Sequence, residues 1–179
     1  MKYLALLRGI NVGGNNIIKM IALKTCFEKL GFSDVVTFIQ SGNVIFSSPE
    51  KDTESLCAKI EHGLSKTFGY TACVVIVKQQ ELKRVVESAP KGFGTEPAAY
   101  RYDAIFVKKP LTVKQAIKDI PYKDGIDEVH TGKDVIYYSR LLSKATQSRM
   151  SKIVLLPIYK QMTIRNWNTT QKLLALMEK

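Results

Sequence analysis

The sequence predicts an α+β protein in which one order of elements, β-α-β-β-α-β, occurs twice. Two observations carry this prediction. Apolar residues alternate between strand and helix spacing in that order in each half, and the hairpin segment Ile39–Gly42 matches Val129–Gly132 further along the chain. The chain has 179 residues, of which 45% are hydrophobic, so it can form a core. Each half then corresponds to a split βαβ, or ferredoxin-like, unit: an antiparallel sheet with helices on one face.

The first half begins with a short apolar strand at residues 3–8, followed by a loop rich in glycine and asparagine. Two amphipathic helices follow, and Gly31 and Gly69 supply their C-terminal stops. A hairpin turn at Ser41–Asn43 lies between the helices, and a strand at 72–77 closes the unit. The apolar positions of the helices are Met20, Leu23, Phe27 and Leu30, then Leu56, Ile60, Leu64 and Phe68. The hairpin strands are expected at 35–39 and 44–47.

The second half repeats this order after a connecting helix and a Pro/Gly-rich stretch at 90–97. The expected elements are the connecting helix at 79–88, strands at 102–107, 126–130, 135–139 and 162–165, and helices at 113–118, 143–159 and 169–177. Pro157 disturbs the end of the long helix. We therefore expect one ferredoxin-like subdomain with the connecting helix at 1–90 and a second at 91–179.

Charge is unevenly distributed along the chain. The net charge is +11, and residues 139–179 hold eight basic side chains against one acidic residue, Glu178. Such an imbalance indicates an anionic partner, although a basic surface that only aids solubility explains it equally well. The three cysteines are widely spaced, and neither a signal peptide nor a membrane span is recognisable. We therefore expect a cytoplasmic protein, with a monomer favoured, and no cofactor. We also expect no metal, because the two histidines have no partners with ligand spacing.

Three segments are more polar than folding requires: residues 6–14 (LLRGINVGG), residues 38–46 (FIQSGNVIF) and residues 163–173 (TIRNWNTTQKL). Turn geometry and helix capping explain many of these residues, with Asn168 and Gln171 resembling a capping pair. Glycines also let backbone N–H groups approach a ligand, and a helix N-terminus beside an arginine favours an anion. Both interpretations remain open for each segment.

The three segments resemble the signatures of the bacterial Domain of Unknown Function 1697 family, and the resemblance spans the chain. It implies two ferredoxin-like subdomains, in agreement with the element order, and it implies no activity. A Ser-Lys pair before the final strand also resembles the family pattern; Ser151-Lys152 fits its spacing better than Ser143-Lys144.

The leading hypothesis is a non-catalytic binding module for an anionic ligand, either nucleic acid or a nucleotide. The candidate ligand-binding residues are Arg8, Asn11, Gly13, Gly14, Gln40, Ser41, Asn43, Lys152, Arg165, Asn166 and Trp167. One alternative is an enzyme acting on a phosphorylated or carboxylated small molecule, with Ser41 or Ser151 taking part in chemistry. Another is a protein-interaction module, and the fold cannot choose among the three. We further expect Arg8 and Arg165 to converge on one cleft.

Overall fold

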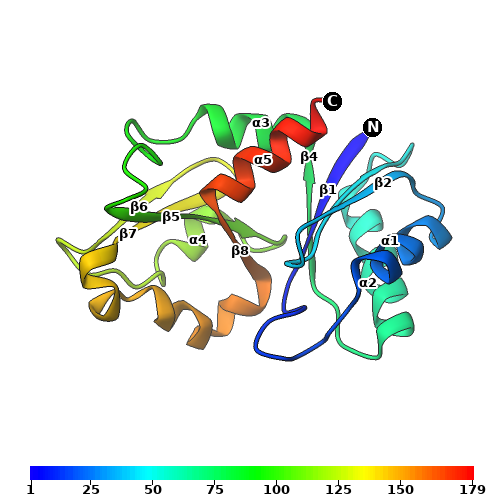
Figure 1. Cartoon of the computed structure of the whole chain (residues 1–179), viewed down its shortest axis with the longest axis horizontal. Coiled ribbons are helices and arrows are strands. Elements are labelled where there is room, and N and C mark those ends of the chain that lie inside the picture. Colours follow the sequence, from blue (N-terminus) through cyan, green and yellow to red (C-terminus); the bar gives the residue numbers. More distant parts are fainter. The chain divides into compact units, whose positions relative to one another are not determined.

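A computed structural model describes residues 1–179, which form two compact units (Figure 1). Unit 1 comprises Met1–Gln80 with Met177–Lys179, and unit 2 comprises Glu81–Leu176. Each unit contains one four-stranded antiparallel sheet, so the α+β class with two such sheets is confirmed. Separate domains at 1–90 and 91–179 stay a prediction. None of the helices has the length and apolar character needed to cross a lipid bilayer.

Unit 1 has the strand order β2-β3-β1-β4, which is the order of a ferredoxin-like sheet. Its elements are β1 (Lys2–Leu7), α1 (Met20–Lys29), β2 (Ser33–Phe38), β3 (Asn43–Ser47), α2 (Thr53–Phe68) and β4 (Val74–Lys78). Alternate residues of β1, including Tyr3, Ala5 and Leu7, form one core with α1 and α2 on one face of the sheet. Phe27 of α1 and Phe46 of β3 meet edge to face with ring centroids 5.6 Å apart.

Unit 2 repeats the same sheet order, β6-β7-β5-β8. Its elements are α3 (Gln79–Glu87, which begins two residues before the unit), β5 (Tyr100–Val107), α4 (Val113–Ala116), β6 (Asp127–Thr131), β7 (Val135–Leu141), the 3₁₀ helices η1 (Leu142–Gln147), η2 (Met150–Leu155) and η3 (Pro157–Gln161), β8 (Met162–Asn166) and α5 (Trp167–Met177). One face of this sheet forms a core with α4 and η2 through residues such as Ile105, Tyr138 and Ile153.

The long helix expected at 143–159 is instead three short 3₁₀ helices, so that prediction was wrong. Ser148, between η1 and η2, donates from Oγ to Asp127 Oδ1 at 2.6 Å and accepts from the Met150 N–H at 3.1 Å. These bonds give the backbone an alternative to helical pairing. Pro157 then cannot donate to a preceding turn, and η3 begins there.

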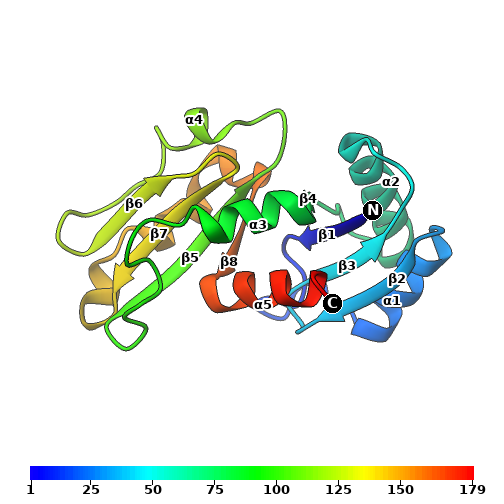
Figure 2. The same ribbon diagram turned by 90° about the horizontal axis from the view of Figure 1, so that it is seen from above.

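Helix α3 lies on the face of the second sheet opposite to η1–η3, as Figure 2 shows. The Tyr137 hydroxyl donates to the Val85 carbonyl at 2.7 Å, and Arg84 forms an ion pair with Asp134 at 2.7 Å. These two contacts join α3 to residues of unit 2. The expectation of helices on one face therefore describes α1 and α2 in unit 1 but is incomplete for unit 2.

Candidate functional site

The first motif leaves β1 as a loop that Asn11 holds in place. Asn11 Nδ2 donates to the Ile18 carbonyl at 3.0 Å and to the Gln40 carbonyl at 2.9 Å, while Oδ1 accepts from the Ile18 N–H at 2.8 Å. Asn11 itself has a φ of +52°, a conformation that asparagine tolerates better than most residues. The side chain therefore ties the loop to the β2–β3 hairpin, and its polar atoms serve the fold.

The second motif is that hairpin, and Asn43 closes it. Asn43 is fully buried, and its Nδ2 donates to the Phe38 carbonyl at 3.0 Å and to Ser41 Oγ at 2.9 Å. The Gly42 carbonyl accepts from the Leu7 N–H at 2.8 Å. A Cβ at Gly42 would lie only 2.8 Å from Leu7 Cβ, so this approach requires glycine.

The first two motifs are thus adjacent within unit 1, as the hydrogen bond from Asn11 to Gln40 shows. Gly13, Gly14 and Gln40 are exposed, and Arg8 is half-buried. These four residues remain ligand-binding candidates, whereas Asn11 has a structural role that accounts for its side chain.

Arg165 in the third motif is buried, with 7% of its surface exposed. Its Nη1 donates to Thr163 Oγ1 at 2.8 Å and to the Ile164 carbonyl at 2.9 Å. Burial disfavours the charged guanidinium and lowers the pKa of Arg165 to about 10, against a smaller opposing effect from Tyr159. Its hydrogen bonds to its own strand give Arg165 a structural role that the sequence did not reveal.

Asn166 joins β8 to α5. Its Oδ1 accepts from the Asn168 N–H at 3.1 Å, and its Nδ2 donates to the Tyr102 carbonyl at 3.2 Å. The helix begins at Trp167, so Asn166 performs the capping that the sequence assigned to Asn168. Because Asn166 is committed to the cap and to β5, the exposed Asn168 is the asparagine of this motif that can face a ligand.

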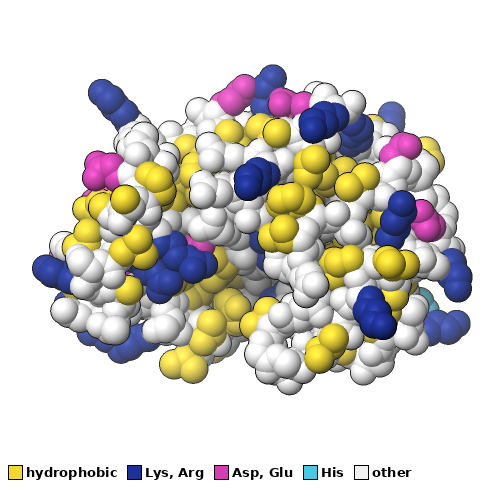
Figure 3. All heavy atoms as spheres, viewed as in Figure 1, with side chains coloured by type: hydrophobic (Ala, Val, Ile, Leu, Met, Phe, Trp, Pro, Cys, Tyr) yellow, Lys and Arg dark blue, Asp and Glu magenta, His cyan; other side chains and the backbone are white.

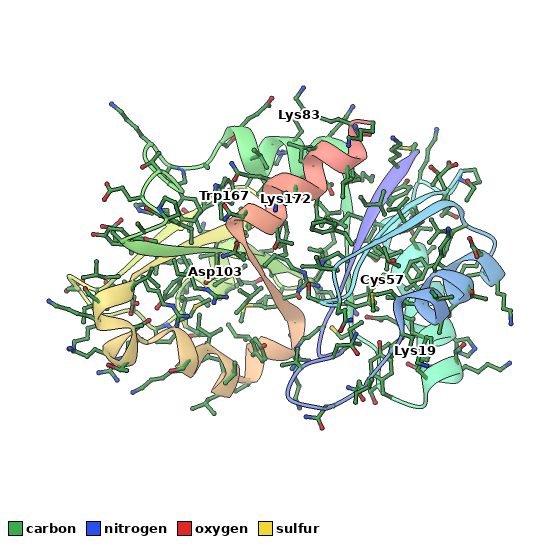
Figure 4. The ribbon with its side chains drawn as sticks, in the orientation of Figure 1. Lys19, Cys57, Lys83, Asp103, Trp167 and Lys172 are labelled. Carbon is green, nitrogen blue, oxygen red and sulfur yellow. The ribbon has the colours of Figure 1, made fainter.

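Trp167 is the single tryptophan of the chain and is 4% exposed at the start of α5 (Figure 4). Its ring meets Phe93 edge-on at 5.0 Å and Tyr137 at 6.0 Å. Phe93 also contacts Tyr102, with ring centroids 4.9 Å apart. A Cβ at Gly94 would lie 2.5 Å from Trp167 Cδ1, so Phe93 and Gly94 pack against the indole.

Lys152 does not join Arg165. It is exposed on η2, which packs on the core face of the sheet through Ile153. Arg165 is directly opposite Ala104 in the strand register, and Ala104 is opposite Tyr137, whose side chain is directed to α3. Lys152 and Arg165 therefore lie on opposite sides of this sheet.

A cavity of about 200 Å³ opens where β5 extends beyond the end of β8. Its lining residues are Pro97, Tyr100, Arg101, Tyr102, Leu142, Asn166, Trp167 and Asn168. We call it the aromatic cavity, because two tyrosines and the tryptophan are among its eight lining residues. It also includes one arginine and the first turn of α5, whose backbone dipole favours negative charge. No carboxylate, histidine or thiol is among the eight lining residues.

Arg101 is held beside the cavity by a buried carboxylate. Its Nε lies 2.9 Å from Asp103 Oδ2, and its Nη2 lies 3.3 Å from Oδ1. Asp103, labelled in Figure 4, is 1% exposed, whereas Arg101 is 47% exposed. Burial raises the pKa of Asp103, and the hydrogen bonds and charge of Arg101 oppose that rise. The other guanidinium donors of Arg101, two N–H groups on Nη1 and one on Nη2, are not among those bonded to Asp103.

Tyr102, which lines the cavity, is close enough to two acidic residues for their charges to affect it. Its pKa is raised, mainly by burial, and the charges of Glu96 and Glu128 add to the rise. Tyr100, Arg101 and Tyr102 were not predicted as site residues: the expected strand covered 102–107, and Tyr100 and Arg101 lay between it and the Pro/Gly-rich stretch. Their alternation of aromatic and basic residues, YRY, was the available signal.

Of the predicted residues, the structure thus brings Asn166 and Trp167 to one cavity in unit 2, and Asn11, Gln40, Ser41 and Asn43 to one loop cluster in unit 1. Arg8 belongs to unit 1 and Arg165 to unit 2, so their convergence on one cleft stays a prediction.

Comparison with known proteins agrees with the signatures. A solved structure, that of the conserved bacterial protein SP0830 from Streptococcus pneumoniae, is similar to this chain with a TM-score of 0.86 and 26% identity, covering 99% of this chain and 98% of that chain. None of the curated proteins matches. A family model described as a protein of unknown function matches residues 1–137, which is well over half of the sequence. The chain therefore belongs to the DUF1697 family.

Proposed function

We propose that the protein is a binding module for an anionic ligand that carries an aromatic ring, of the nucleotide type, and that the aromatic cavity is its site. The composition of the cavity wall carries the proposal. Tyr100 and Tyr102, which are partly exposed, offer aromatic surface to a ring beside the largely buried Trp167, and Arg101 and the N-terminal turn of α5 favour an anion. A stacked base contributes about 1–3 kcal/mol in proteins that use aromatic side chains in this way.

Binding fits this site better than catalysis. The ionisable lining groups are one arginine and two tyrosines, and the groups that most often move a proton, namely histidine, carboxylate and thiol, are not among the lining residues. The serines named for an enzyme are elsewhere: Ser41 accepts a hydrogen bond within the β2–β3 hairpin, and Ser151 is exposed on η2.

The test uses the fluorescence of Trp167, which is specific to this site because the chain has one tryptophan. Titration with AMP, GMP, CMP and UMP should quench its emission at saturation. The variant Asn168→Asp places a carboxylate at the cavity, and a like charge at about 4 Å costs roughly 1 kcal/mol in water-like surroundings. Affinity should therefore fall about fivefold, while stability is kept because an acidic residue suits a helix N-terminus.

Gln171→Glu is the matched control. It makes the same change in charge in the same helix at an exposed position that does not line the cavity. Equal affinities for the two variants, or no quenching by any nucleotide, would contradict the proposal.

A second candidate is a protein-interaction surface in unit 1. Three aliphatic side chains, from the end of the first motif to the start of α1, are strongly exposed: Val12 (63%), Ile17 (78%) and Ile21 (83%). Exposed apolar groups of this kind favour contact with another protein. Sedimentation velocity over a range of concentrations tests self-association through this surface, with Ile17→Ser as the variant that should reduce it. A monomer at every concentration, with and without the substitution, removes self-association as its use.

A further inference from the structure

The size of the aromatic cavity limits what it can hold. Its volume of about 200 Å³ is below the roughly 300–1,000 Å³ of sites that enclose a whole small molecule. A space of this size suits one base better than a complete nucleotide. The sugar and phosphates of a bound nucleotide would therefore lie outside, on the surface next to the cavity mouth.

That surface continues into the most basic part of the chain. Residues 140–160, here called the basic segment, include Leu142, which lines the cavity. The segment contains five basic residues and no acidic one. Its basic residues are Arg140, Lys144, Arg149, Lys152 and Lys160. A chain of phosphates leaving the cavity on this side would meet only positive or neutral side chains from the segment.

The basic segment has a fixed backbone although it contains no α-helix. Asp127 of β6 accepts from the Ser148 hydroxyl at 2.6 Å and from the Arg149 N–H at 2.8 Å. These bonds hold the junction of η1 and η2 against the sheet. Arg149 directly precedes η2, and its carbonyl accepts from the Lys152 N–H at 2.9 Å, so the two basic residues are one turn apart at the start of this helix.

The acidic groups beneath the segment are turned inward. Asp103 is 1% exposed and Asp127 is 3% exposed, and both carboxylates accept hydrogen bonds. The lysines at 144 and 152 are exposed. Figure 3 shows Lys and Arg side chains gathered over the sheet and 3₁₀ helices of unit 2, beside hydrophobic ones. Unit 2 as a whole holds 17 basic and 9 acidic residues, a net charge of +8.

We propose that the natural ligand is a single-stranded polynucleotide, with one base in the aromatic cavity and the following phosphates along the basic segment. This rests on the proposed function of the cavity and extends it from a nucleotide to a strand. Neutralised phosphates release condensed counterions, with a salt slope of about 0.7 per contact for single strands. If four residues each contact a phosphate, raising the salt from 50 to 200 mM should weaken binding about 50-fold. These residues are Arg101, Lys144, Arg149 and Lys152.

The experiment compares thymidine monophosphate with an oligothymidylate of about ten nucleotides, within the range of known single-strand site sizes. Fluorescence anisotropy of the labelled oligonucleotide gives affinity and salt slope, and quenching of Trp167 reports the base. We expect the oligonucleotide to bind more tightly than the monophosphate and to quench Trp167. The double variant Lys144→Ala, Lys152→Ala should reduce the salt effect from about 50-fold to about sevenfold. Oligouridylate in parallel distinguishes RNA from DNA as the strand.

The control double variant is Lys24→Ala, Lys29→Ala, which removes two exposed lysines from α1 in unit 1 and should leave the slope unchanged. If the monophosphate quenches Trp167 but the oligonucleotide binds no more tightly, the polynucleotide is excluded while the cavity stands. If the oligonucleotide binds without quenching Trp167, the cavity itself is not the site, and both proposals fail.

Basic residues also attract anionic lipid surfaces. The exposed apolar side chains of Val154 (52%) and Leu155 (79%) beside Lys152 would suit such a surface. Cosedimentation with phosphatidylserine vesicles tests it. Vesicle binding that oligothymidylate does not compete would overturn the polynucleotide proposal. The cavity favours the polynucleotide, because a lipid headgroup offers no ring to its aromatic wall.

Discussion

Replacing Gly94 by alanine should destabilise unit 2 and move Trp167. Gly94 has a φ of +90°, and a left-handed conformation costs a residue with a Cβ about 1–2 kcal/mol. The added Cβ would also lie 2.5 Å from Trp167 Cδ1 and 2.6 Å from Nε1, so the indole must shift. Because Trp167 is 4% exposed and contacts Phe93 and Tyr137, this overpacking adds about 1–3 kcal/mol. The total loss in free energy of unfolding is about 2–5 kcal/mol.

Gly92→Ala is the control, because it has the same backbone strain without the clash. Gly92 has a φ of +82°, and its Cβ would meet only Thr95 Oγ1, at 3.9 Å. Urea denaturation followed by circular dichroism gives the two free energies, and Trp167 emission reports the displacement. We expect Gly94→Ala to be less stable than Gly92→Ala by about 1–3 kcal/mol, with altered emission in Gly94→Ala alone. Equal stabilities and unchanged emission would refute the packing of this loop against the indole.

Three further predictions concern packing and burial. Gly42→Ala should lower the free energy of unfolding in urea by about 1–3 kcal/mol more than Gly9→Ala. A Cβ at Gly42 would lie 2.8 Å from Leu7 Cβ, whereas one at Gly9 meets nothing within 4 Å, so equal losses would contradict the close approach. Tyr70→Phe should raise the melting temperature, because the buried Tyr70 hydroxyl has no hydrogen-bond partner. Tyr137→Phe should instead lower the free energy of unfolding by about 1 kcal/mol, because it removes the hydrogen bond to the Val85 carbonyl. A loss of stability in Tyr70→Phe together with a gain in Tyr137→Phe would show that the two hydroxyl environments are misassigned. Burial raises the pKa of Tyr137 from 10.0 to about 12, so between these pH values unfolding releases a proton and the free energy of unfolding falls as the pH rises. In denaturation experiments from pH 10 to 12, the free energy of unfolding of Tyr137→Phe should fall less steeply than that of the wild type, and an equal slope would argue against the shift.

The fold was predictable because each element carries its own local signal. In α2, three local signals agree: apolar residues recur at helical spacing, Asp52 caps the start by accepting hydrogen bonds, and Gly69 ends the helix in the left-handed conformation. The segment 143–159 was not predictable in the same way. Its apolar residues suit a helix, but Ser148 bonds to Asp127, which is far away in the sequence, and that contact decides the local backbone.

The aromatic cavity was only half predictable for a similar reason. Asn166 and Trp167 stand out in a short polar motif, so the sequence alone marks them. Tyr100, Arg101 and Leu142 join them because β5 pairs with both β7 and β8, and because the chain after β7 turns back past the end of β5, where the Leu142 N–H donates to the Ala99 carbonyl at 2.8 Å. Strand pairing brings these residues together, and no local pattern encodes it.

The polar residues of the motifs divide by what their side chains contact. Asn11, Asn43 and Asn166 satisfy backbone groups at points where a strand gives way to a loop or a helix. An asparagine suits these points because its amide both donates and accepts, and such a role would select it without any ligand. Asn168 differs, since it is exposed at the mouth of a cavity with aromatic walls while Asn166 performs the cap beside it. The motif TIRNWNTTQKL therefore combines a structural asparagine with one that can recognise a ligand, and Asn168→Asp separates the two roles.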